Sequence, residues 1–588
     1  MTYEQWIALH DTFSAEDQRA IQKHISAFGS RPLLSVLMPT YNTPERWLRR
    51  AIESVRRQLY PFWELCIADD ASTDPHVRAV LEEYRHLDHR MHVIYRELNG
   101  HISAASNSAL GLASGEFVVF LDHDDEMPDH ALYMVANALN DNSELDLLYS
   151  DEDKIDESNR RYGPHFKPDW NPDLVNGQNM VNHLCVYRTA LVRSLGGLRE
   201  GYEGAQDWDL LLRISECIPA SRICHIPYVL YHWRAVSGST AATANEKPYA
   251  FQAAAKGLRD HLERTGQQGL VFRTAGEYFR IKRVTPSPAP LVSIVIPTRN
   301  GLHLLRRCID SLRKRTRYPR YEILIVDNQS DDPKTLGYLE QVSRSEDTRV
   351  LRFDFPFNYS ALNNFAARES RGAYLCLMNN DIETISEDWL DEMVGQAARP
   401  GIGAVGAKLY YPNETIQHAG VILGLGGIAG HPYSGTERHS FGYMARLMLV
   451  QNVSAVTAAC LVVRKDIFEE VKGLDEVNLT IAFNDVDFCL RLLERGYRNL
   501  WTPYAELYHH ESATRGPEDT REKQLRFQRE VAYMEARWGH VLEYDPAHNV
   551  NLTLENSWPN LASRPRKTKP WCSQGDRIRR KHSAGINP

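Results

Sequence analysis

The sequence lacks the features that mark membrane-spanning, secreted and disulfide-rich proteins. No apolar run approaches the roughly 18 residues of a spanning helix, and Met1 is followed by acidic and polar residues rather than by a signal peptide. The nine cysteines make an odd number, show no CxxC spacing and lie mostly within apolar runs. We therefore expect buried free thiols in a cytoplasmic protein that is at most peripheral to the inner face of the plasma membrane.

An excess of positive charge is also missing. The 68 Lys and Arg residues stand against 76 Asp and Glu, and the formal net charge of -8 excludes the global basic field of a nucleic-acid binder. With 43% hydrophobic and 24% charged residues the composition is that of a globular protein, and 588 residues exceed the size that one core serves. We expect two domains and a small-molecule partner.

The most informative feature present is an internal repeat. LSVLMPT at 34–40 returns as VSIVIPT at 292–298, and CIADD at 66–70 returns as LIVDN at 324–328, each 258 positions later. FLDHD at 120–124 matches LMNND at 377–381, and QDWDLLLR at 206–213 matches NDVDFCLR at 484–491. A duplication of this length predicts two domains of one fold, with about 20 extra residues in the second copy.

The extra residues include a glycine-rich stretch, Gly424 to Gly430, that could be taken for a dinucleotide-binding turn. His431 and Pro432 follow it where a helix should begin, and no acidic residue stands at the expected distance after a second strand. We therefore expect a loop here.

Composition shifts divide the chain into five parts. A Pro-rich connector at 284–290 separates a first domain at 33–283 from a second at 291–550, and we expect it to isolate their cores. Residues 1–32 have the apolar spacing of one or two short helices packed on the first domain. Residues 551–588 form a basic tail that we expect to be disordered from residue 562; it is a solvated tail or one weakly attracted to anionic lipid.

Within each copy, short β-branched runs alternate with helical patterns. The first copy predicts strands at 34–38, 64–68, 92–95 and 116–121, and helices near 45–59, 75–86 and 102–113. This alternation is typical of βαβ units in a mainly parallel α/β sheet, whose ligands bind beyond the carboxyl ends of the strands. The repeated polar residues follow those ends: Thr40, Asn42, Asp69, Asp122 and Asp124.

Candidate metal ligands recur in both copies. Asp124 and Asp381 follow apolar strands, where a bare carboxylate is costly unless a cation compensates it. Mg or Mn needs only one or two carboxylates plus substrate phosphates, so both copies suffice, although such a turn is more often a cap or loop when it stands alone. His232 and His509, also repeated, could complete each site as neutral imidazoles, the alternative being a structural role.

Candidate general bases lie near the start of two amphipathic helices. Asp207 and Asp485 recur there, each followed two residues later by a second acid, Asp209 or Asp487. Helix capping accounts for one acid of each pair, and the other can project into the cleft as a base. We favour Asp207 and Asp485 as the bases.

Together these motifs resemble family-two glycosyltransferases of the GT-A fold, over about 500 residues in two copies. The residues that carry the resemblance are PTYN at 39–42, ADDAS at 68–72, LDHDD at 121–125 and GAQDWD at 204–209. More specific motifs resemble the tandem, rhamnosyltransferase-like enzymes of bacterial O-antigen and surface-polysaccharide assembly: YSDEDK at 149–154, FKPDW at 166–170, DFPFNYS at 354–360, IQHAG at 416–420 and YHHES at 508–512.

The resemblance implies two inverting sites that use nucleotide-sugar donors, a divalent cation and a saccharide or lipid-linked saccharide acceptor. Asp69 and Asp327 would contact the nucleotide base, Asp124 and Asp381 the metal-bridged diphosphate, and Asp207 and Asp485 the acceptor hydroxyl. The full set implied to bind the donor is Pro39, Thr40, Asn42, Asp69, Asp70, Asp122, Thr298, Asp327 and Asn379.

Two departures from the pattern fall in the second copy, where Asn379 and Asn328 replace acids, and we expect them to weaken metal affinity more than activity. A nucleotidyltransferase is disfavoured, because PTYN at 39–42 and PTRN at 297–300 stand where its Gly-rich basic loop should be. The remaining alternative is one active domain joined to a non-catalytic saccharide-binding or scaffold domain.

Overall fold

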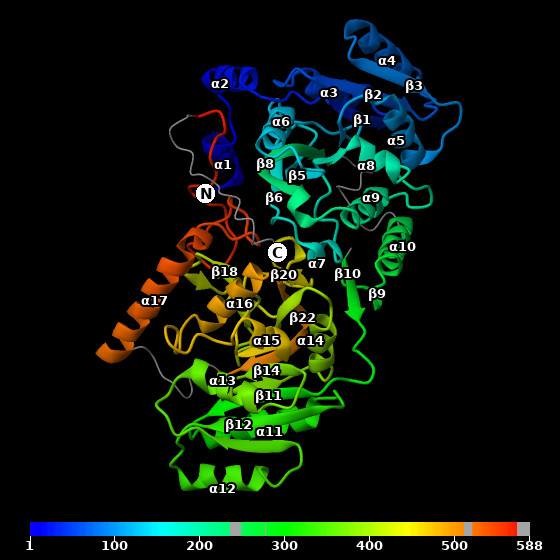
Figure 1. Ribbon diagram of the computed structural model, residues 1–588. Coiled ribbons are helices and arrows are strands. Elements are labelled where there is room, and N and C mark those ends of the chain that lie inside the picture. The colour runs from blue at the N-terminus through cyan, green and yellow to red at the C-terminus, as the bar shows by residue number, and fades with distance from the viewer. Residues whose placement is uncertain (236–247, 277, 511–519, 573–588) are drawn as a thin grey trace.

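The computed structural model describes residues 1–235, 248–276, 278–510 and 520–572. It contains two α/β units, each with its own large sheet, the first drawn in blue to cyan and the second in green to yellow (Figure 1). The expected fold class, two α/β domains in tandem, is confirmed.

The first sheet has the strand order β3-β2-β1-β4-β7-β5-β6, with β8 beside β5. Its strands are β1 (Leu34–Thr40), β2 (Trp63–Asp69), β3 (Met91–Tyr95), β4 (Phe117–Phe120), β5 (Leu147–Ile155), β6 (Arg161–His165), β7 (Cys185–Arg188) and β8 (Ile223–Arg234). The helices of this unit are α3 (Glu45–Arg56), α4 (Pro75–Leu87), α5 (His101–Leu112), α6 (Ala131–Asp141), α7 (Pro172–Val175), α8 (Thr189–Ser194), α9 (Gln206–Ser215) and α10 (Pro248–Arg264), followed by the hairpin β9 (Gly269–Arg273) and β10 (Phe279–Arg283).

The predicted strands and helices of the first copy are confirmed to within a few residues. Strand β1 is buried along its whole length, as its unbroken apolar run requires of a strand covered on both faces. The strands from β3 to β4 are parallel, β7 runs antiparallel to both β4 and β5, and β8 is again parallel to β5. Six of the eight strands therefore run in the same direction, with only β6 and β7 reversed, so the expected mainly parallel sheet is confirmed.

The second sheet has the order β13-β12-β11-β14-β21-β16-β22-β15 and repeats this plan. Its strands are β11 (Val292–Thr298), β12 (Tyr321–Asp327), β13 (Thr348–Arg352), β14 (Tyr374–Met378), β15 (Ile382–Thr384), β16 (Ile402–Tyr410), β17 (Ile416–His418), β20 (Gln451–Asn452), β21 (Cys460–Arg464) and β22 (Arg498–His509). Its helices are α11 (Leu302–Arg315), α12 (Pro333–Val342), α13 (Tyr359–Glu369), α14 (Trp389–Ala397), α15 (Lys465–Glu470), α16 (Asn484–Glu494) and α17 (Arg521–Leu542). The glycine-rich stretch forms the turn of a short hairpin between β18 (Ile422–Leu423) and β19 (Ala429–Gly430), so the prediction of a loop is confirmed.

The two cores are not isolated from one another, in contrast to the expectation from the Pro-rich connector. Asn171 Nδ2 donates to the carbonyl of Asn452 at 2.8 Å, and Asn452 Nδ2 donates to Asp173 Oδ2 at 2.9 Å. Arg399 forms an ion pair with Asp173 at 2.5 Å, and all four side chains are largely buried. The apolar side chain of Leu449, from the second unit, joins the core of the first.

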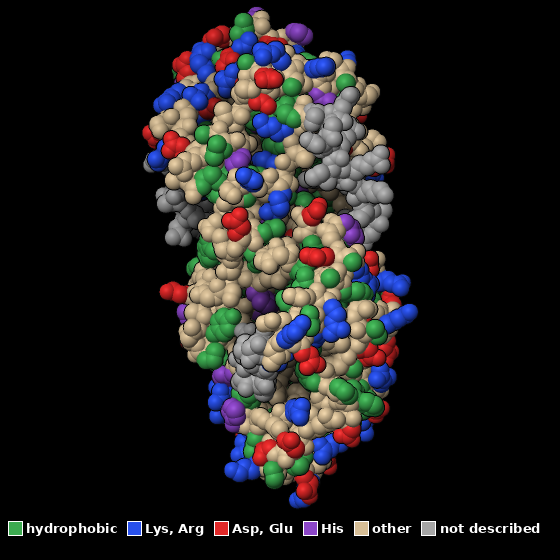
Figure 2. Space-filling view, turned by 90° about the vertical axis from the view of Figure 1, so that its left-hand side faces the viewer, with side chains coloured by type: hydrophobic (Ala, Val, Ile, Leu, Met, Phe, Trp, Pro, Cys, Tyr) green, Lys and Arg blue, Asp and Glu red, His purple; other side chains and the backbone are tan. Residues whose placement is uncertain are grey.

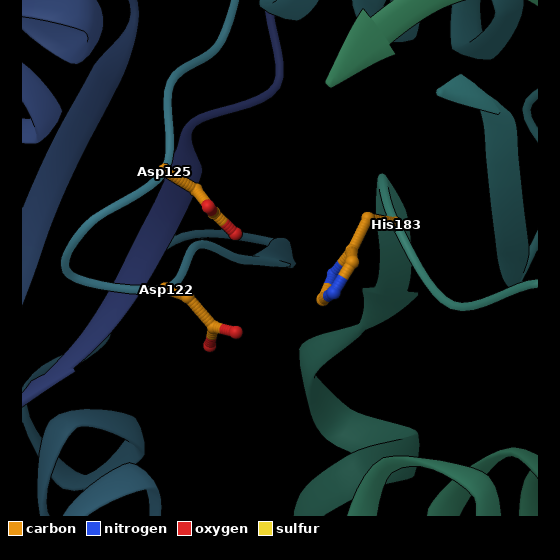
Figure 3. A group of neighbouring side chains, drawn as sticks. All are labelled: Asp122, Asp125 and His183. Carbon is orange, nitrogen blue, oxygen red and sulfur yellow. The ribbon is translucent and has the colours of Figure 1, made fainter. Parts of the chain in front are cut away.

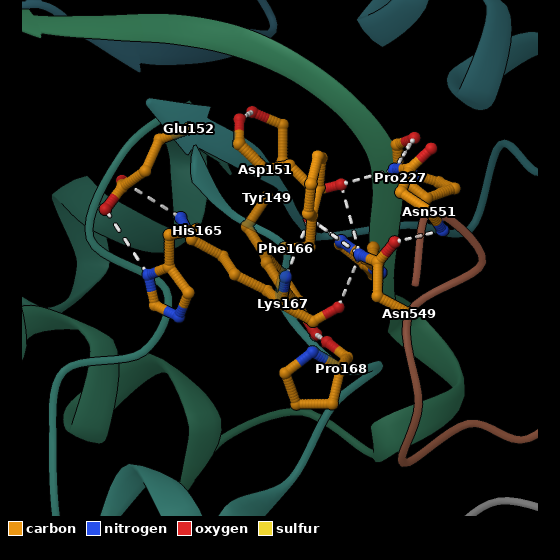
Figure 4. A network of polar contacts seen from close by, with 12 residues as sticks. Tyr149, Asp151, Glu152, His165, Phe166, Lys167, Pro168, Pro227, Asn549 and Asn551 are labelled. Atoms are coloured by element: carbon orange, nitrogen blue, oxygen red, sulfur yellow. Dashed lines mark hydrogen bonds and ion pairs between the residues drawn. The ribbon is translucent and has the colours of Figure 1, made fainter. Parts of the chain in front are cut away.

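The end of the described chain lies against both units. Ser454 Oγ donates to Asp545 in the second unit, while Asn549 and Asn551 donate to Asp151 in the first (Figure 4). Trp571 is buried in the first core. The expected disorder is therefore wrong for residues 562–572; Arg577, Arg579, Arg580 and Lys581 lie outside the described residues.

The N-terminal segment folds into α1 (Tyr3–His10) and α2 (Ala15–Ser26), as predicted, and each begins with a capping box. Charged side chains of both signs are mixed over the face shown in Figure 2. None of the helices in the described ranges is long and apolar enough to cross a membrane. All nine cysteines are free thiols, with Cys217 and Cys572 exposed and most of the others buried.

Candidate donor and acceptor sites

In each unit, one asparagine forms hydrogen bonds that hold the loop after the first strand. Asn42 Oδ1 accepts hydrogen bonds from the backbone amides of Thr73 and Asp74 at 2.8 and 3.2 Å. Asn300 Oδ1 repeats this with Asp331 and Asp332, at 3.1 and 3.0 Å. The two asparagines therefore join neighbouring strand-end loops and give the sheet edge one shape in both units.

Asp69 and Asp327 lie at that edge, as the sequence predicted. Each is buried at the end of its strand, opposite Thr40 or Thr298 in register. Asp69 accepts from the amide of Ser72 at 3.4 Å, and Asp327 from the amide of Ser330 at 3.2 Å. The remaining oxygen of Asp327 forms an ion pair with Arg352.

Asp70 shapes the next loop, because its carboxylate accepts from Arg96 Nε at 2.7 Å and from the amide of Gly100 at 3.0 Å. The second unit does the same with a neutral side chain: Asn328 Nδ2 donates to the carbonyls of Phe353 and Phe355, at 3.1 and 2.8 Å. The change from Asp to Asn therefore keeps the loop contact.

Three further residues expected to bind the donor are part of the sheet edge. Pro39 pairs with Ala68 inside the first sheet, and the Thr40 side chain is buried. The Thr298 hydroxyl oxygen accepts from Asn380 Nδ2 at 2.9 Å.

Asp381, Asn379 and His509 meet where β14 and β22 end in the second unit. His509 Nε2 lies 3.2 Å from Asp381 Oδ1 and 3.3 Å from Asn379 Nδ2. The other ring nitrogen, Nδ1, lies 2.9 Å from Gln417 Oε1. Asp381 Oδ1 is buried and accepts no hydrogen bond from the described residues. One nitrogen of the His509 ring is held by Gln417, and the other lies beside a carboxylate oxygen. These two groups are a donor set that fits a divalent cation.

Asp485 is connected to this group through Tyr359 and Ala458. The Tyr359 hydroxyl lies 3.2 Å from Asn379 Oδ1 and 3.1 Å from the carbonyl of Ala458, whose amide donates to Asp485 Oδ2 at 3.0 Å. Burial and then the charges of Asp485 and Asp381 raise the pKa of Tyr359. Tyr359 lies within the motif at 354–360, and the sequence pattern indicated no role for it.

Asp122, Asp125 and His183 form the corresponding group in the first unit, with ligand atoms within 4.8 Å of one another (Figure 3). The His183 ring stacks on Tyr231 with centroids 4.3 Å apart, and burial lowers the pKa of His183 to about 4, which leaves it neutral at pH 7. Asp125 is engaged by the Tyr231 hydroxyl at 2.6 Å, and burial raises its pKa well above the ordinary value. The half-buried Asp124 is not a member of this group.

His232 is not part of this group, which corrects the expectation that it is a metal ligand. Its Nδ1 lies 2.6 Å from Asp153 Oδ1, on the sheet face opposite to that of its neighbour Tyr231. The cause is register: His509 pairs with Ile382, one residue after Asp381, whereas His232 pairs with Glu126, two residues after Asp124. A shift of one residue turns a side chain to the other face.

His183 takes the place near the strand end that His232 was expected to fill. It precedes β7 and belongs to none of the matched repeat motifs, so no signal in the sequence pointed to it.

The paired acids of α9 and α16 have different surroundings. Asp209 and Asp487 are buried ion-pair partners, at 2.9 Å from Arg213 and 2.8 Å from Arg491. The N-cap residues are Ala205 and Phe483, and neither makes a side-chain capping bond. In the second pair Asp485, although it is not the N-cap residue, accepts from the first-turn amide of Val486 at 2.9 Å, so one acid there makes a bond of the capping kind.

Asp207 and Asp485 are the acids of each pair that form no ion pair within the described residues, although both oxygens of Asp485 accept from backbone amides. Asp207 Oδ2 accepts from Asn179 Nδ2 at 2.7 Å, and burial raises the pKa of Asp207. Asp485 is partly buried and has one oxygen directed to the amide of Ala458, as described above. Both carboxylates lie in the first turn of their helix, where the helix dipole favours a negative charge.

Comparison with known proteins identifies relatives over nearly the whole chain. The family model "Glycosyl transferase family 2" matches residues 35–196 and 293–472, more than half of the sequence. An uncharacterized protein, y4gI, of Sinorhizobium fredii is 50% identical over 92% of this chain and 59% of its own length. The O-antigen biosynthesis protein RfbC of Myxococcus xanthus is 38% identical over 94% of this chain and 42% of its own length. The chain thus spans about half the length of these relatives.

Solved structures are more distant. S. aureus TarS residues 1-349 in complex with UDP-GlcNAc is 23% identical, with a TM-score of 0.32, over 38% of this chain and 66% of that one. The mannosyltransferase PcManGT of Pyrobaculum calidifontis, in complex with GDP-Man and Mn2+, is 16% identical, with a TM-score of 0.33, over 50% of this chain and 74% of that one.

Proposed function

The chain belongs to glycosyl transferase family 2, and from this premise we propose that it carries two inverting sites that move sugars from nucleotide-sugar donors to a growing saccharide acceptor. The name of the O-antigen relative supports a cell-surface polysaccharide as the product, built on a saccharide or lipid-linked saccharide. The single observation that carries the proposal is the convergence of Asn379, Asp381 and His509 with Asp485 in the second unit.

In this proposal Asp485 is the general base. Its carboxylate takes the proton of the acceptor hydroxyl while the hydroxyl oxygen bonds to the anomeric carbon. The bond from that carbon to the diphosphate oxygen breaks on the opposite face, so the configuration inverts and a nucleoside diphosphate leaves. Asp207 has the same role in the first unit, and Asp69 and Asp327 lie where they could contact the nucleotide base.

Asp381 and His509 would hold a divalent cation, Mg or Mn, in the second unit. The buried oxygen of Asp381 that accepts no hydrogen bond within the described chain and the imidazole fixed by Gln417 support this assignment. When bound, such a cation neutralises the charge that develops on the leaving diphosphate. In the first unit Asp122 and His183 fit the same role, with Asp124 two positions after Asp122.

A second candidate function, one active domain and one saccharide-binding or scaffold domain, is favoured by one difference between the units. Asp125 of the first group is buried, engaged by Tyr231 and has a raised pKa, so its carboxylate is less available to a cation than the buried Asp381 oxygen that accepts no hydrogen bond within the described chain. If only one unit is active, the second unit is the better candidate.

The test is sugar transfer by the full chain and by Asp207→Asn and Asp485→Asn, with a panel of nucleotide sugars and with EDTA. Two independent sites predict that each variant loses one linkage and keeps the other when the intermediate acceptor is supplied, and that EDTA removes both. Loss of both linkages in either variant would contradict independent sites. Full turnover in excess EDTA would remove the metal from the proposal.

A further inference from the structure

An open pocket of about 660 Å³ lies between the starts of α11 and α12, next to the loop that holds Asn300. Basic side chains of Arg306, Arg307 and Lys334 line it. Arg306 and Lys334 are exposed, and neither forms an ion pair with a carboxylate of the described residues. The pocket thus presents cationic groups whose charge the fold does not neutralise directly.

In the first unit, carboxylates pair with the arginines at the corresponding positions. At the position of Arg306, the fifth residue of its helix, α3 has Arg49, which pairs with Glu45 at 2.8 Å and with Glu83 at 2.7 Å. Next to it, Arg50 pairs with Glu126 at 2.6 Å. Both arginines of the first unit are therefore neutralised by carboxylates.

The second unit has neither of the two carboxylates that pair with Arg49 in the first unit. Leu302 begins α11 where Glu45 begins α3, and Gln341 stands in α12 at the place that Glu83 has in α4. Arg306 lies over the Tyr338 ring, 5.1 Å from its centroid. The opening of the pocket is thus a difference between two copies of one fold within the same chain.

Arg307 lies beside a histidine ring in place of a carboxylate. Its Nη1 lies 3.2 Å from His510 Nε2, and that same nitrogen lies 3.0 Å from Glu383 Oε2. The backbone amide of His510 donates to the carbonyl of Asp381 at 3.0 Å. A ligand in the pocket would therefore contact the strand-end loop through Asn300 and would reach, through Arg307, the residue that follows the proposed metal ligand His509.

Two carboxylates, Asp310 and Asp332, also line the pocket. Asp332 caps α12, since it accepts from the amide of Thr335 at 2.9 Å and from its hydroxyl at 2.6 Å. These bonds hold the carboxylate at the start of that helix, where it also attracts Lys334 electrostatically. The N-cap of α11 is Gly301, which makes no side-chain capping bond, so the first amides of this helix of 14 residues add to the positive potential of the wall.

We propose that this pocket binds the phosphate or diphosphate group of a second ligand, separate from the sugar donor. Arginine guanidinium groups offer paired N–H donors that match phosphate oxygens, and a lysine and an uncapped helix start complement them. The phosphate belongs to a soluble phosphate ester or to a lipid headgroup, which share this chemistry. The proposal does not depend on sugar transfer by either unit.

The test measures binding of inorganic pyrophosphate to the full chain by calorimetry, with EDTA present so that no divalent cation assists. The double variant Arg306→Gln with Lys334→Gln should weaken binding at least tenfold. Leu302→Glu should weaken binding too, because it places a carboxylate near Arg306, as Glu45 lies next to Arg49 in the first unit. All three positions are exposed or half-buried, and melting curves of each variant verify the fold.

Two further variants make the result specific. Arg49→Gln, at the corresponding position of the first unit, should leave pyrophosphate binding unchanged, and so should Asp381→Asn. Equal affinity in the wild type and the double variant would overturn the proposal. Tighter binding in Asp381→Asn would also overturn it, because without a cation the loss of this carboxylate relieves repulsion only if the anion occupies the donor site.

A second arm identifies the source of the phosphate. Vesicles of phosphatidylcholine with phosphatidylglycerol are sedimented with the wild type and with the double variant. Sedimentation of the wild type alone indicates a lipid headgroup, whereas pyrophosphate binding without sedimentation indicates a soluble phosphate ester. Both results support the phosphate chemistry.

Discussion

At the scale of single residues, two acids of one helix turn have opposite surroundings. Asp487 is buried and bonded to Arg491 at 2.8 Å and to Trp538 Nε1 at 2.9 Å. Asp485, two positions earlier, is only partly buried and is bonded to backbone amides. The sequence shows both acids in the same pattern, and only the packing of α17 against α16 separates a structural acid from a candidate base.

We predict that Asp485→Asn folds normally and binds donor normally but transfers the second sugar on the order of a hundredfold more slowly or worse, because it removes the basic oxygen and keeps the shape. The measurement is the transfer rate at saturating donor, with a melting curve of the same preparation. Near-normal turnover in a stably folded variant would contradict the role of Asp485.

Asp487→Asn is the matched control, and we expect it to lower the stability of the fold without removing the proposed base. It leaves the buried Arg491 without its charge partner, at a cost of about 3–5 kcal/mol of unfolding free energy. Chemical unfolding measures this loss. Unchanged stability would mean that the ion pair of Asp487 does not contribute to the fold.

His225 gives the protein a pH-dependent contact. Burial alone would lower the pKa of His225, but Asp151 at 2.9 Å and Asp169 outweigh it and raise the pKa to about 9. Because this value lies above that of an unfolded histidine, about 6.5, the stabilisation is complete below pH 6.5 and is lost as the pH rises through 9. We expect His225→Gln to be less stable than the wild type at pH 6.5, and the difference to shrink by pH 10. Unfolding by urea at both pH values measures it.

At the scale of elements, the sequence predicted where strands and helices lie along the chain better than it predicted the sheet face to which a side chain points. The strands and helices of the first copy, and the strand-end places of Asp69 and Asp327, follow from periodicity and from the repeat. His232 and His509 match in sequence, yet a shift of one residue in pairing sends them to opposite faces. Register depends on bulges and neighbouring strands, which a sequence match does not reveal.

This difference predicts unequal metal effects. In an Asp207→Asn background, where only the second site acts, His509→Gln should raise the Mn concentration needed for half-maximal transfer at least tenfold. His232→Gln in the same background should leave it unchanged, because His232 lies in the first unit and is bonded to Asp153. A metal requirement that is the same in the His509 variant and its parent would remove His509 from the site.

At the scale of the whole molecule, the packing between the two units was the least predictable feature. The Pro-rich connector suggested independent cores, but the buried contacts of Asn171 and Asp173 with Asn452 and Arg399 join them. These contacts lie more than 200 positions apart in the chain, and nothing in local periodicity indicates them. Residues 551–572 likewise looked like part of a tail because the composition from residue 551 onwards is basic.

The buried charge of Asp173 makes the interface testable. Burial opposes ionisation of Asp173, but the charges of Arg399, Arg498 and Arg283 outweigh it and hold its pKa below the ordinary value. Asp173→Asn removes the negative charge and leaves three arginines facing one another in a buried space. We expect a loss of about 3–5 kcal/mol in unfolding free energy, as for other buried pairs that lose one partner.

The loss should appear in both units at once, since Asp173 belongs to the first and Arg399 to the second. Hydrogen exchange resolved along the chain measures this, with faster exchange expected in α7 and β20 and in the strands next to them. The control is Asp466→Asn, which removes an exposed ion pair with Arg464 and should change stability by less than about 0.5 kcal/mol. If Asp173→Asn increased exchange only in the first unit, the two cores would be independent after all, and the interface would not contribute to the stability of the second unit.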